Sequence, residues 1–211
     1  MINLVEKIII VTSDTRQNHN SRPNLIPATK IFSPPFTLFI EVDLDESGYL
    51  FTALDSPHEV DHLQEISLKV DTDKNTVTAY IKNEEEEKFL SLSYKKNNSN
   101  KVVFSLDKSQ AVLCVDEVEI SCNINIKSPF LQKGESYLGS YKLYYEPEKR
   151  PFKGSIKSFK IFNRRTLGVH LEPVDRSLIC DLDFHNRTPW RIFDRSQNRL
   201  HGFWYKREEF K

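Results

Sequence analysis

Pro151-Phe-Lys-Gly-Ser-Ile-Lys-Ser-Phe-Lys-Ile-Phe-Asn163 is the stretch that decides the fold. Its glycine predicts a tight turn, and the residues after the turn predict a β-strand. Apolar side chains stand at Ile156, Phe159, Ile161 and Phe162. No residue of the stretch is suited to catalysis, so it informs about architecture and not about chemistry.

The rest of the chain has the same β character. Within Phe36–Leu44 every second residue from Phe36 onward is apolar, as in a strand with one face in a core. Further strands are predicted at Ile8–Thr12, Tyr49–Leu54, Ile66–Val70, Thr76–Ile81, Phe89–Tyr94, Lys101–Leu106, Ala111–Ser121, Ile124–Ile126, Tyr137–Tyr145, Ser155–Phe162, Ser177–Phe184, Arg191–Phe193 and Leu200–Tyr205. With 211 residues, this pattern predicts one all-β domain over 1–211, a two-sheet antiparallel jelly-roll β-sandwich.

One short helix is predicted, over 57–66. Ser56 is a suitable N-cap, Pro57 suits the first turn, and Glu59 completes a capping box. The remaining sequence has almost no helical periodicity.

The charge balance and the hydropathy exclude two classes of partner. Basic and acidic residues number 30 each, so the net charge is zero and the basic excess of a nucleic-acid-binding protein is missing. No apolar run approaches the ~20 residues that span a bilayer. We therefore expect no nucleic-acid partner and no membrane span.

The N-terminus and the cysteines indicate the compartment of synthesis. Glu6 and Lys7 interrupt the first apolar run, and no small-residue cleavage site follows, so no signal peptide is predicted. Three cysteines are an odd number, which argues for a reducing compartment, although Cys114 and Cys122 would approach each other on paired strands. A cytoplasmic and a virion location both fit, and the sequence leaves the choice open.

Five fragments, in order, resemble the laminin G-like domains of the concanavalin A-like lectin and glucanase superfamily. The fragments are Phe36–Asp43, Gly48–Leu54, Lys101–Val118, Tyr137–Gly139 and Phe152–Leu167. Their order and spacing agree over about 36–167. The resemblance implies a jelly-roll sandwich that is used mostly for binding and sometimes for cleaving sugars.

The C-terminal part of the chain resembles a segment that normally opens such a domain. Leu182–Phe184 and Phe193–Gly202 carry this resemblance, but here they close the chain. We therefore hypothesise a circularly permuted sandwich, whose first hairpin comes from the C-terminus. The hypothesis predicts that Arg191–Tyr205 runs beside the Ile8 strand or the Ile156 strand.

Glu41, Asp43 and Glu46 are the candidate catalytic carboxylates. Their spacing resembles the acidic strand of laminarinase-type glucanases, in which period-2 geometry and a bulge aim three carboxylates into a cleft. The resemblance implies that Glu41 is the nucleophile, Asp43 a helper and Glu46 the acid/base. The alternative, which we favour, is an acidic strand end that runs into the Ser47-Gly48 turn, with no catalysis.

Aromatic clusters are candidates for a sugar-binding platform, because ring faces stack on the C–H faces of sugars. The candidate ligand-binding residues are Tyr141, Tyr144, Tyr145, Trp190 and Trp204. The alternative is that these rings fill the space between the two sheets.

Two clusters suggest metals, although we expect no bound cofactor. His58 and His62 match the H-E-x-x-H spacing of a zinc site. The alternative, which we favour, is that these residues belong to a solvated loop or a short helix without a metal. Laminin G-like domains often bind calcium at a loop edge, and Asp71, Asp73 and Asn75 alternate in a turn with suitable oxygens. A hairpin turn rich in Asp and Asn explains the same residues without a metal.

The sequence thus predicts a non-catalytic binding module with a carbohydrate or another protein as partner, acting through a sandwich face or through edge loops. A structural subunit of a phage or viral particle, such as a decoration, tail or baseplate protein, is the alternative. The third hypothesis is a laminarinase-type glycoside hydrolase. We expect the chain to work within an oligomer or a larger assembly.

Overall fold

A computed structural model describes most of the chain. The described residues are 2–4, 7–10, 34–44, 46–55, 64–96, 98–127, 130–131, 135–139, 152, 154–165, 177–187, 191–196 and 202–205. None of them lies in a helix, so this part of the chain contains no helix that is long and apolar enough to cross a membrane.

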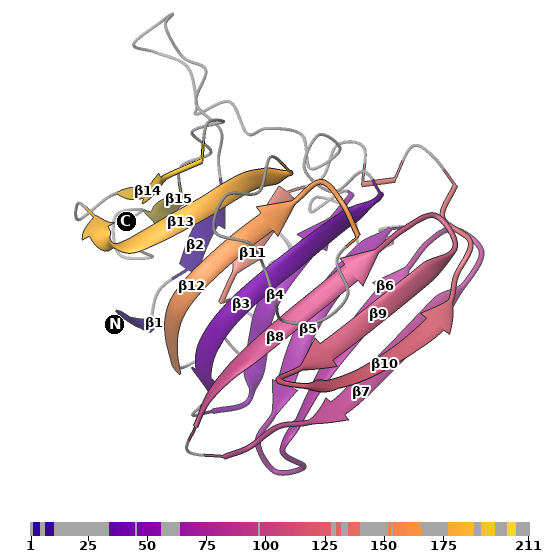
Figure 1. Ribbon diagram of the computed structural model, residues 1–211, viewed down its shortest axis with the longest axis horizontal. Helices are drawn as coiled ribbons and strands as arrows, with labels where there is room; N and C mark the ends of the chain where they lie inside the picture. Colours follow the sequence, from indigo (N-terminus) through magenta and orange to yellow (C-terminus); the bar gives the residue numbers. More distant parts are fainter. Residues whose placement is uncertain are drawn as a thin grey trace, which may run out of the picture.

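Fifteen antiparallel strands make up the described fold (Figure 1). In chain order they are β1 (Ile2–Leu4), β2 (Lys7–Ile10), β3 (Phe36–Leu44), β4 (Gly48–Leu54), β5 (Glu65–Asp71), β6 (Thr76–Lys82), β7 (Glu87–Ser93), β8 (Ser99–Leu106), β9 (Gln110–Val115), β10 (Val118–Asn123), β11 (Glu135–Leu138), β12 (Gly154–Phe162), β13 (Leu178–Arg187), β14 (Arg191–Asp194) and β15 (Gly202–Tyr205).

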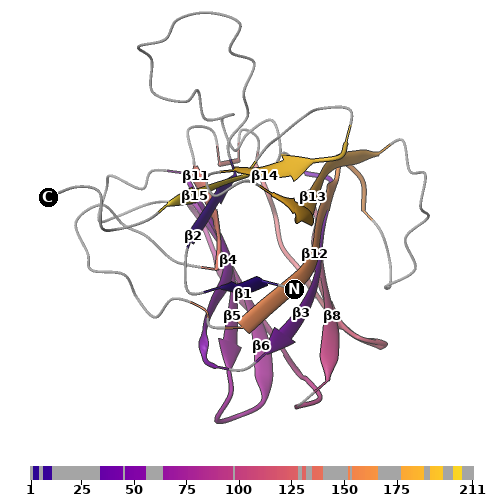
Figure 2. The same cartoon turned by 90° about the vertical axis from the view of Figure 1, so that its left-hand side faces the viewer.

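The strands form two facing layers. One layer has the order β10-β9-β8-β3-β12-β13, and the other has the order β2-β11-β4-β5-β6-β7. Strands β14 and β15 continue the hydrogen-bonded path from the first layer into the second, and Figure 2 shows β14 crossing at one end of the sandwich. The predicted all-β, two-layer antiparallel jelly-roll sandwich of the concanavalin A-like type is confirmed.

Alternation along the strands creates the core between the layers. In β3, Leu38, Ile40 and Val42 are fully buried in the main core cluster, as the period-2 pattern predicted. From the opposite layer Phe51 meets Phe159 of β12, with ring centroids 6.0 Å apart. Burying one side chain of this size contributes about 1.5–3 kcal/mol, so the facing inner surfaces hold the layers together.

The stretch around β12 lies centrally in its layer, paired with β3 on one side and β13 on the other. Ile156, Phe159 and Ile161 enter the main core, whereas Phe162 packs in a smaller cluster on the outer face. Gly154 is the first residue of the strand rather than part of a turn. A Cβ there would lie 2.4 Å from the Asp43 carbonyl oxygen and 2.4 Å from the Phe152 ring, so close packing requires the glycine.

A strand from the N-terminal part of the chain and one from the C-terminal part lie side by side. Strand β15 pairs with β2, with Trp204 opposite Ile8, and β13 pairs with β12. The adjacency that the permutation hypothesis predicted for Arg191–Tyr205 and the Ile8 strand is therefore confirmed. Strand β1 adds to the layer of β12, with Ile2 opposite Ile156.

Several sequence predictions of local structure need correction. The strand predicted at Ile124–Ile126 does not form, because β10 ends at Asn123 and residues 124–127 are not in a strand. The helix predicted over 57–66 does not reach its expected end, because Glu65 and Ile66 belong to β5; residues 56–63 lie outside the described part. The single strand predicted at Ala111–Ser121 is a hairpin of β9 and β10. Asp116 turns the chain there with a φ of 56°, a conformation that asparagine and aspartate adopt more readily than most residues.

The three cysteines are free thiols. Cys114 and Cys122 are on paired strands but not opposite each other, since Cys114 pairs with Glu119 and Cys122 with Ala111. Burial raises the pKa of each thiol, and Cys180 is fully buried whereas Cys122 is partly exposed. The reactive thiolate is therefore disfavoured at neutral pH.

We expect Gly154→Ala to lower the free energy of unfolding by about 1–3 kcal/mol, because the added methyl group overlaps backbone and ring atoms. Chemical denaturation measures the loss. Ser158→Ala, a partly buried position of the same strand, is the matched control and should change little. Equal stability of both variants would contradict the close packing at Gly154.

We expect a thiol-specific reagent to modify Cys122 first in the native protein. Cys114 and Cys180 are 3% and 0% exposed, so they should react only when the protein unfolds. Mass spectrometry of partially labelled protein, with and without denaturant, gives the order. Early modification of Cys180 in the native state would show that its strand opens readily.

Candidate functional site

The two outer faces of the sandwich differ in exposure. On the outer face of the β3 layer, Phe39, Val103, Cys114 and Phe162 form a buried cluster with at most 8% exposure. The outer face of β4–β7 instead carries a groove of about 530 Å³. A ligand that binds a sheet face therefore has room on β4–β7.

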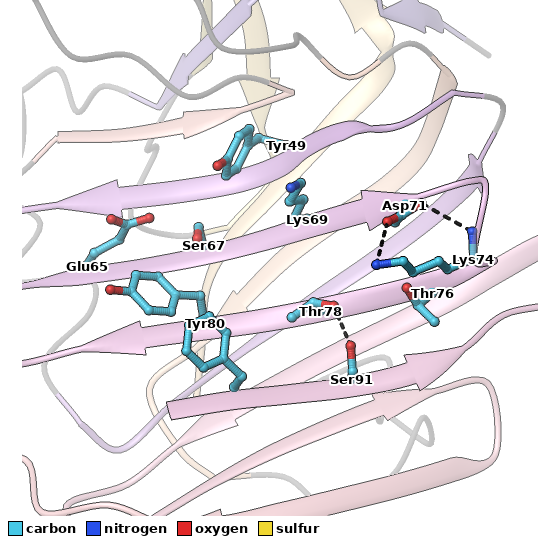
Figure 3. A pocket seen from close by; sticks show the side chains of 11 residues that line it. Tyr49, Glu65, Ser67, Lys69, Asp71, Lys74, Thr76, Thr78, Tyr80 and Ser91 are labelled. Atoms are coloured by element: carbon cyan, nitrogen blue, oxygen red, sulfur yellow. Dashed lines mark hydrogen bonds and ion pairs between the residues drawn. The ribbon is translucent and has the colours of Figure 1, made fainter. Parts of the chain in front are cut away.

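The groove is lined by the outward side chains of four neighbouring strands and one turn (Figure 3). Its lining residues are Tyr49, Glu65, Ser67, Lys69, Asp71, Lys74, Thr76, Thr78, Tyr80, Phe89 and Ser91. The alternate residues of β5, among them Ile66 and Leu68, are in the core. The same alternation that fills the core thus places polar and aromatic side chains outside.

Two aromatic rings, tilted against each other, form one wall of the groove. Tyr80 of β6 and Phe89 of β7 are directly opposite each other, with ring centroids 4.8 Å apart and an interplanar angle of 35°. Phe89 is 65% exposed, which is unusual for a side chain of its size. The pair presents a wide apolar surface to solvent.

A third aromatic ring, Tyr49, borders the groove from β4, two strands away from Tyr80. The register of β4 shifts between Tyr49 and Phe51, and both Leu50 and Phe51 enter the core. This irregularity lets Tyr49 face outward before the buried residues. The Lys69 ammonium group lies 5.9 Å from the centre of the Tyr49 ring, within reach of a cation–π interaction.

Hydroxyl groups form the floor between the aromatic rings. Ser67 is opposite Tyr80 across β5 and β6, and Thr78 is opposite Ser91 across β6 and β7. The Thr78 and Ser91 side-chain hydroxyls are hydrogen-bonded to each other. Hydroxyls both donate and accept, so this floor suits a polar ligand rich in hydroxyl groups.

Charges of both signs surround the floor. The Asp71 carboxylate accepts hydrogen bonds from the backbone N–H groups of Asp73 and Lys74, at 3.1 and 3.2 Å, and lies 3.8 Å from the Lys74 ammonium group. Glu65 is 4% exposed, whereas Lys69 is exposed. The lining charges therefore balance, with carboxylate and ammonium groups on β5 itself.

Burial raises the pKa of the Tyr80 hydroxyl, and its hydrogen bond to Glu87 and the negative charges of Glu87 and Glu65 raise it further. All of these effects disfavour the phenolate. The hydroxyl consequently keeps its proton and donates a hydrogen bond to the Glu87 carboxylate, which holds the ring in place beside Phe89.

The carboxylates predicted as catalytic lie on the other layer. Glu41 and Asp43 are on the outer side of β3, while Glu46 follows the end of that strand at Leu44. The Asp43 carboxylate is 2.8 Å from the Lys157 ammonium group. The three carboxylates thus do not share one strand, and they are not among the residues that line the β4–β7 groove.

The residues predicted to bind calcium lie in the hairpin between β5 and β6. Asp71 lines the groove, Asp73 is exposed, and Asn75 has a φ of 52°. One Asp71 oxygen already accepts the two turn N–H groups. No group of three or more His, Cys, Asp or Glu side chains in the described part of the chain is arranged to hold a metal ion.

Most of the other predicted site residues lie outside the described part. These are His58, His62, Tyr141, Tyr144, Tyr145 and Trp190. For Trp204 the structure describes the backbone, in β15. Their predicted roles in binding sugar or metal stay predictions.

Sequence reasoning missed Tyr49, Tyr80 and Phe89. A signal was present, because Thr76, Thr78 and Tyr80 alternate with core residues and so belong to an outer face. Whether Tyr49, Tyr80 and Phe89 come together in one groove depends on the strand register, which the sequence pattern does not give.

Comparisons with known proteins agree on the fold. No protein-family model matches the chain, and no curated protein matches it. Among solved structures, the Ruminococcus gnavus IT-sialidase CBM40 matches with a TM-score of 0.54 at 17% identity, covering 77% of this chain and 92% of that one. The same module bound to α2,3-sialyllactose matches with a TM-score of 0.52 at 17% identity, covering 63% and 77%.

The leech intramolecular trans-sialidase also matches, with a TM-score of 0.51 at 15% identity; 63% of this chain aligns with 22% of the enzyme. At these identities the likeness shows a shared jelly-roll sandwich and no more. The class that the fold defines is therefore the concanavalin A-like β-sandwich.

We expect Tyr80 to keep its proton at a pH at which an ordinary tyrosine, with a pKa of about 10, ionises. Because the folded pKa is raised, the stabilisation by protonated Tyr80 is complete below about pH 10 and declines as the pH rises further. Absorbance titration of tyrosinate in the wild type and in Tyr80→Phe tests this.

The two titration curves should coincide up to about pH 10 and differ only above it. Glu87→Gln should lower the pKa of Tyr80 towards its usual value, because it removes the carboxylate. A tyrosine that titrates near pH 10 and disappears in Tyr80→Phe would contradict the arrangement.

Proposed function

We propose that this protein is a carbohydrate-binding module that holds its ligand in the β4–β7 groove. The observation that carries the proposal is the exposed Tyr80–Phe89 pair, which faces Tyr49 across a floor of hydroxyl groups. The opposite outer face has its apolar side chains buried. Among the described residues, the exposed ring of Phe89 is on the β4–β7 face, which carries the groove.

The chemistry of the groove matches that of a sugar. Pyranose rings have an apolar C–H face, which stacks on an aromatic ring, and a polar rim of hydroxyl groups. The Tyr80–Phe89 pair and Tyr49 supply aromatic surfaces on either side, and Ser67, Thr78 and Ser91 supply donors and acceptors. Tyr49 is opposite Lys69, whereas Tyr80 is opposite Ser67, so the two rings are offset by two residues as well as by two strands. At about 4.8 Å per strand and about 3.4 Å per residue, this separation is about 12 Å, which suits a short oligosaccharide rather than one sugar ring.

The comparisons support the same class of ligand without identifying it. One of the matched structures is the R. gnavus module in complex with sialyllactose. In the present chain the lining charges balance, so an acidic sugar and a neutral one both remain candidates for the groove.

A glycan array with purified protein tests the proposal. Binding to a defined set of oligosaccharides, which groove variants lose, would support it. An array without any bound glycan, from protein that is folded and loaded at high concentration, would reject it. Cleavage of a bound oligosaccharide would instead favour the hypothesis of a glycoside hydrolase.

We expect Tyr80→Ala and Phe89→Ala each to weaken binding of a soluble oligosaccharide at least about tenfold, equivalent to about 1.4 kcal/mol. Each change removes one ring of the exposed pair. Isothermal titration calorimetry with an array-selected ligand measures the affinity.

Val118→Ala is the matched control, because Val118 is a similarly exposed apolar strand residue outside the groove, at 58% exposure. It should leave the affinity unchanged. Equal losses in Val118→Ala and Phe89→Ala would place the binding site elsewhere.

A further inference from the structure

The described strands leave an open edge of the sandwich, at which another chain could pair. Strands β7 and β10 end the hydrogen-bonded path of the described strands, one in each layer. The exposed large apolar residues of the described part are Phe89 on β7 and Val118 and Ile120 on β10. Phe89 belongs to the groove, so Val118 and Ile120, at 58% and 38% exposure, are left without a role.

Strand β7 carries a feature that opposes pairing with another chain. Lys88 is in the same alternation as the core residues Leu90 and Leu92, so it points towards the core side at the rim of the sandwich. Its ammonium group forms a 2.8 Å ion pair with Glu86. A charge on the core side of an edge strand is a known protection against edge-to-edge association.

Strand β10 carries no such charge of its own. Lys88 and Glu86 of the other layer lie close enough to Cys122, near its C-terminal end, to affect the pKa of that thiol. Val118, Ile120 and Cys122 are opposite the core residues Val115, Leu113 and Ala111, so their side chains share the core side of the sheet. The one charged residue of the strand, Glu119, is on the other side, opposite Cys114. The strand contains no lysine and no proline.

We propose that β10 pairs antiparallel with β10 of a second copy of this chain, which joins the two sheets edge to edge into a dimer. The second copy is the favoured occupant because the strand is complementary to itself. With Ile120 opposite the second copy's Ile120, Val118 faces Cys122 and Glu119 faces Ser121. The apolar side chains of the two strands then meet on the core side, bordered at Cys122 by the Lys88–Glu86 ion pair of each copy, and no like charges of β10 are opposite each other.

Other registers of the β10–β10 pair would be less favourable. A shift by one residue pairs core-side with outer-side residues, which the alternation of strands forbids. A shift by two residues towards the turn brings the two Glu119 carboxylates opposite each other. A shift by two in the other direction moves the partner position of Val118 to Ile124, beyond the end of β10.

The dimer has a consequence for the proposed carbohydrate-binding function. The two-fold axis of such an antiparallel pair runs perpendicular to the sheet, and rotation about it keeps the outward direction of each face. The two β4–β7 grooves therefore open towards the same side. Two sites on one side engage a glycan-covered surface together, which raises the apparent affinity about 10²-fold or more over a single site.

Light scattering coupled to size-exclusion chromatography, over a range of concentrations of the full chain, tests the dimer. We expect twice the 24.7 kDa chain mass for the wild type and the chain mass for Ile120→Lys, because two ammonium groups would meet on the axis. Ser121→Lys adds the same charge on the opposite side of the strand, facing Glu119 of the second copy, and should remain dimeric.

A wild type that stays monomeric at every concentration would overturn the dimer. An Ile120→Lys protein that remains dimeric would place the contact elsewhere, and a monomeric Ser121→Lys protein would reject the register. Thermal unfolding establishes that each variant is folded; Val118→Lys, at a more exposed position, replaces Ile120→Lys should the latter fail to fold.

The avidity effect rests on the proposed carbohydrate function and has a separate readout. Ile120→Lys should keep the wild-type affinity for a soluble oligosaccharide and lose about 10²-fold in binding to the same glycan on a dense surface. Equal surface binding by both proteins would contradict the arrangement of the grooves. Absence of any glycan binding would reject the carbohydrate function while the mass measurement still decides the dimer.

Discussion

Contact between the two inner sheet faces is the interaction on which the rest of the structure depends. Phe51 of one layer and Phe159 of the other meet in the middle of the sandwich, amid a core to which most strands contribute. Once these faces are buried, alternation leaves every second side chain of each strand outside. The groove and the outward charges are therefore determined by the same packing that stabilises the fold.

The two outer faces and the open edge differ in the side chains that they expose. The β3 layer has a buried apolar cluster around Phe39 on its outer side, whereas β4–β7 presents Tyr80 and Phe89 to solvent. At the edge, β7 has the charge of Lys88 on the core side, whereas β10 has the exposed Ile120 there. The proposed ligand binding and the proposed self-association thus use different elements, so one can be altered without the other.

The sequence predicted the architecture well because strand alternation is a local property. The apolar period of Phe36–Leu44 gives the inward face of β3 directly, and the stretch before Asn163 gives the central strand β12. Local signals failed where one residue departs from its usual behaviour. Asp116 takes the left-handed conformation that glycine usually supplies, so the β9–β10 hairpin looked like one strand. Gly154 looked like a turn residue but is needed for close packing.

The sequence by itself determined the fold class, the antiparallel layers and the faces of the long strands, since each follows from neighbours along the chain. Only the tertiary structure decided which side chains meet. Tyr49 and Phe89 border one groove because β4, β5, β6 and β7 pair in a particular register, with an irregularity beside Tyr49. Register depends on packing across the whole sheet, and a shift of one residue would turn these rings into the core.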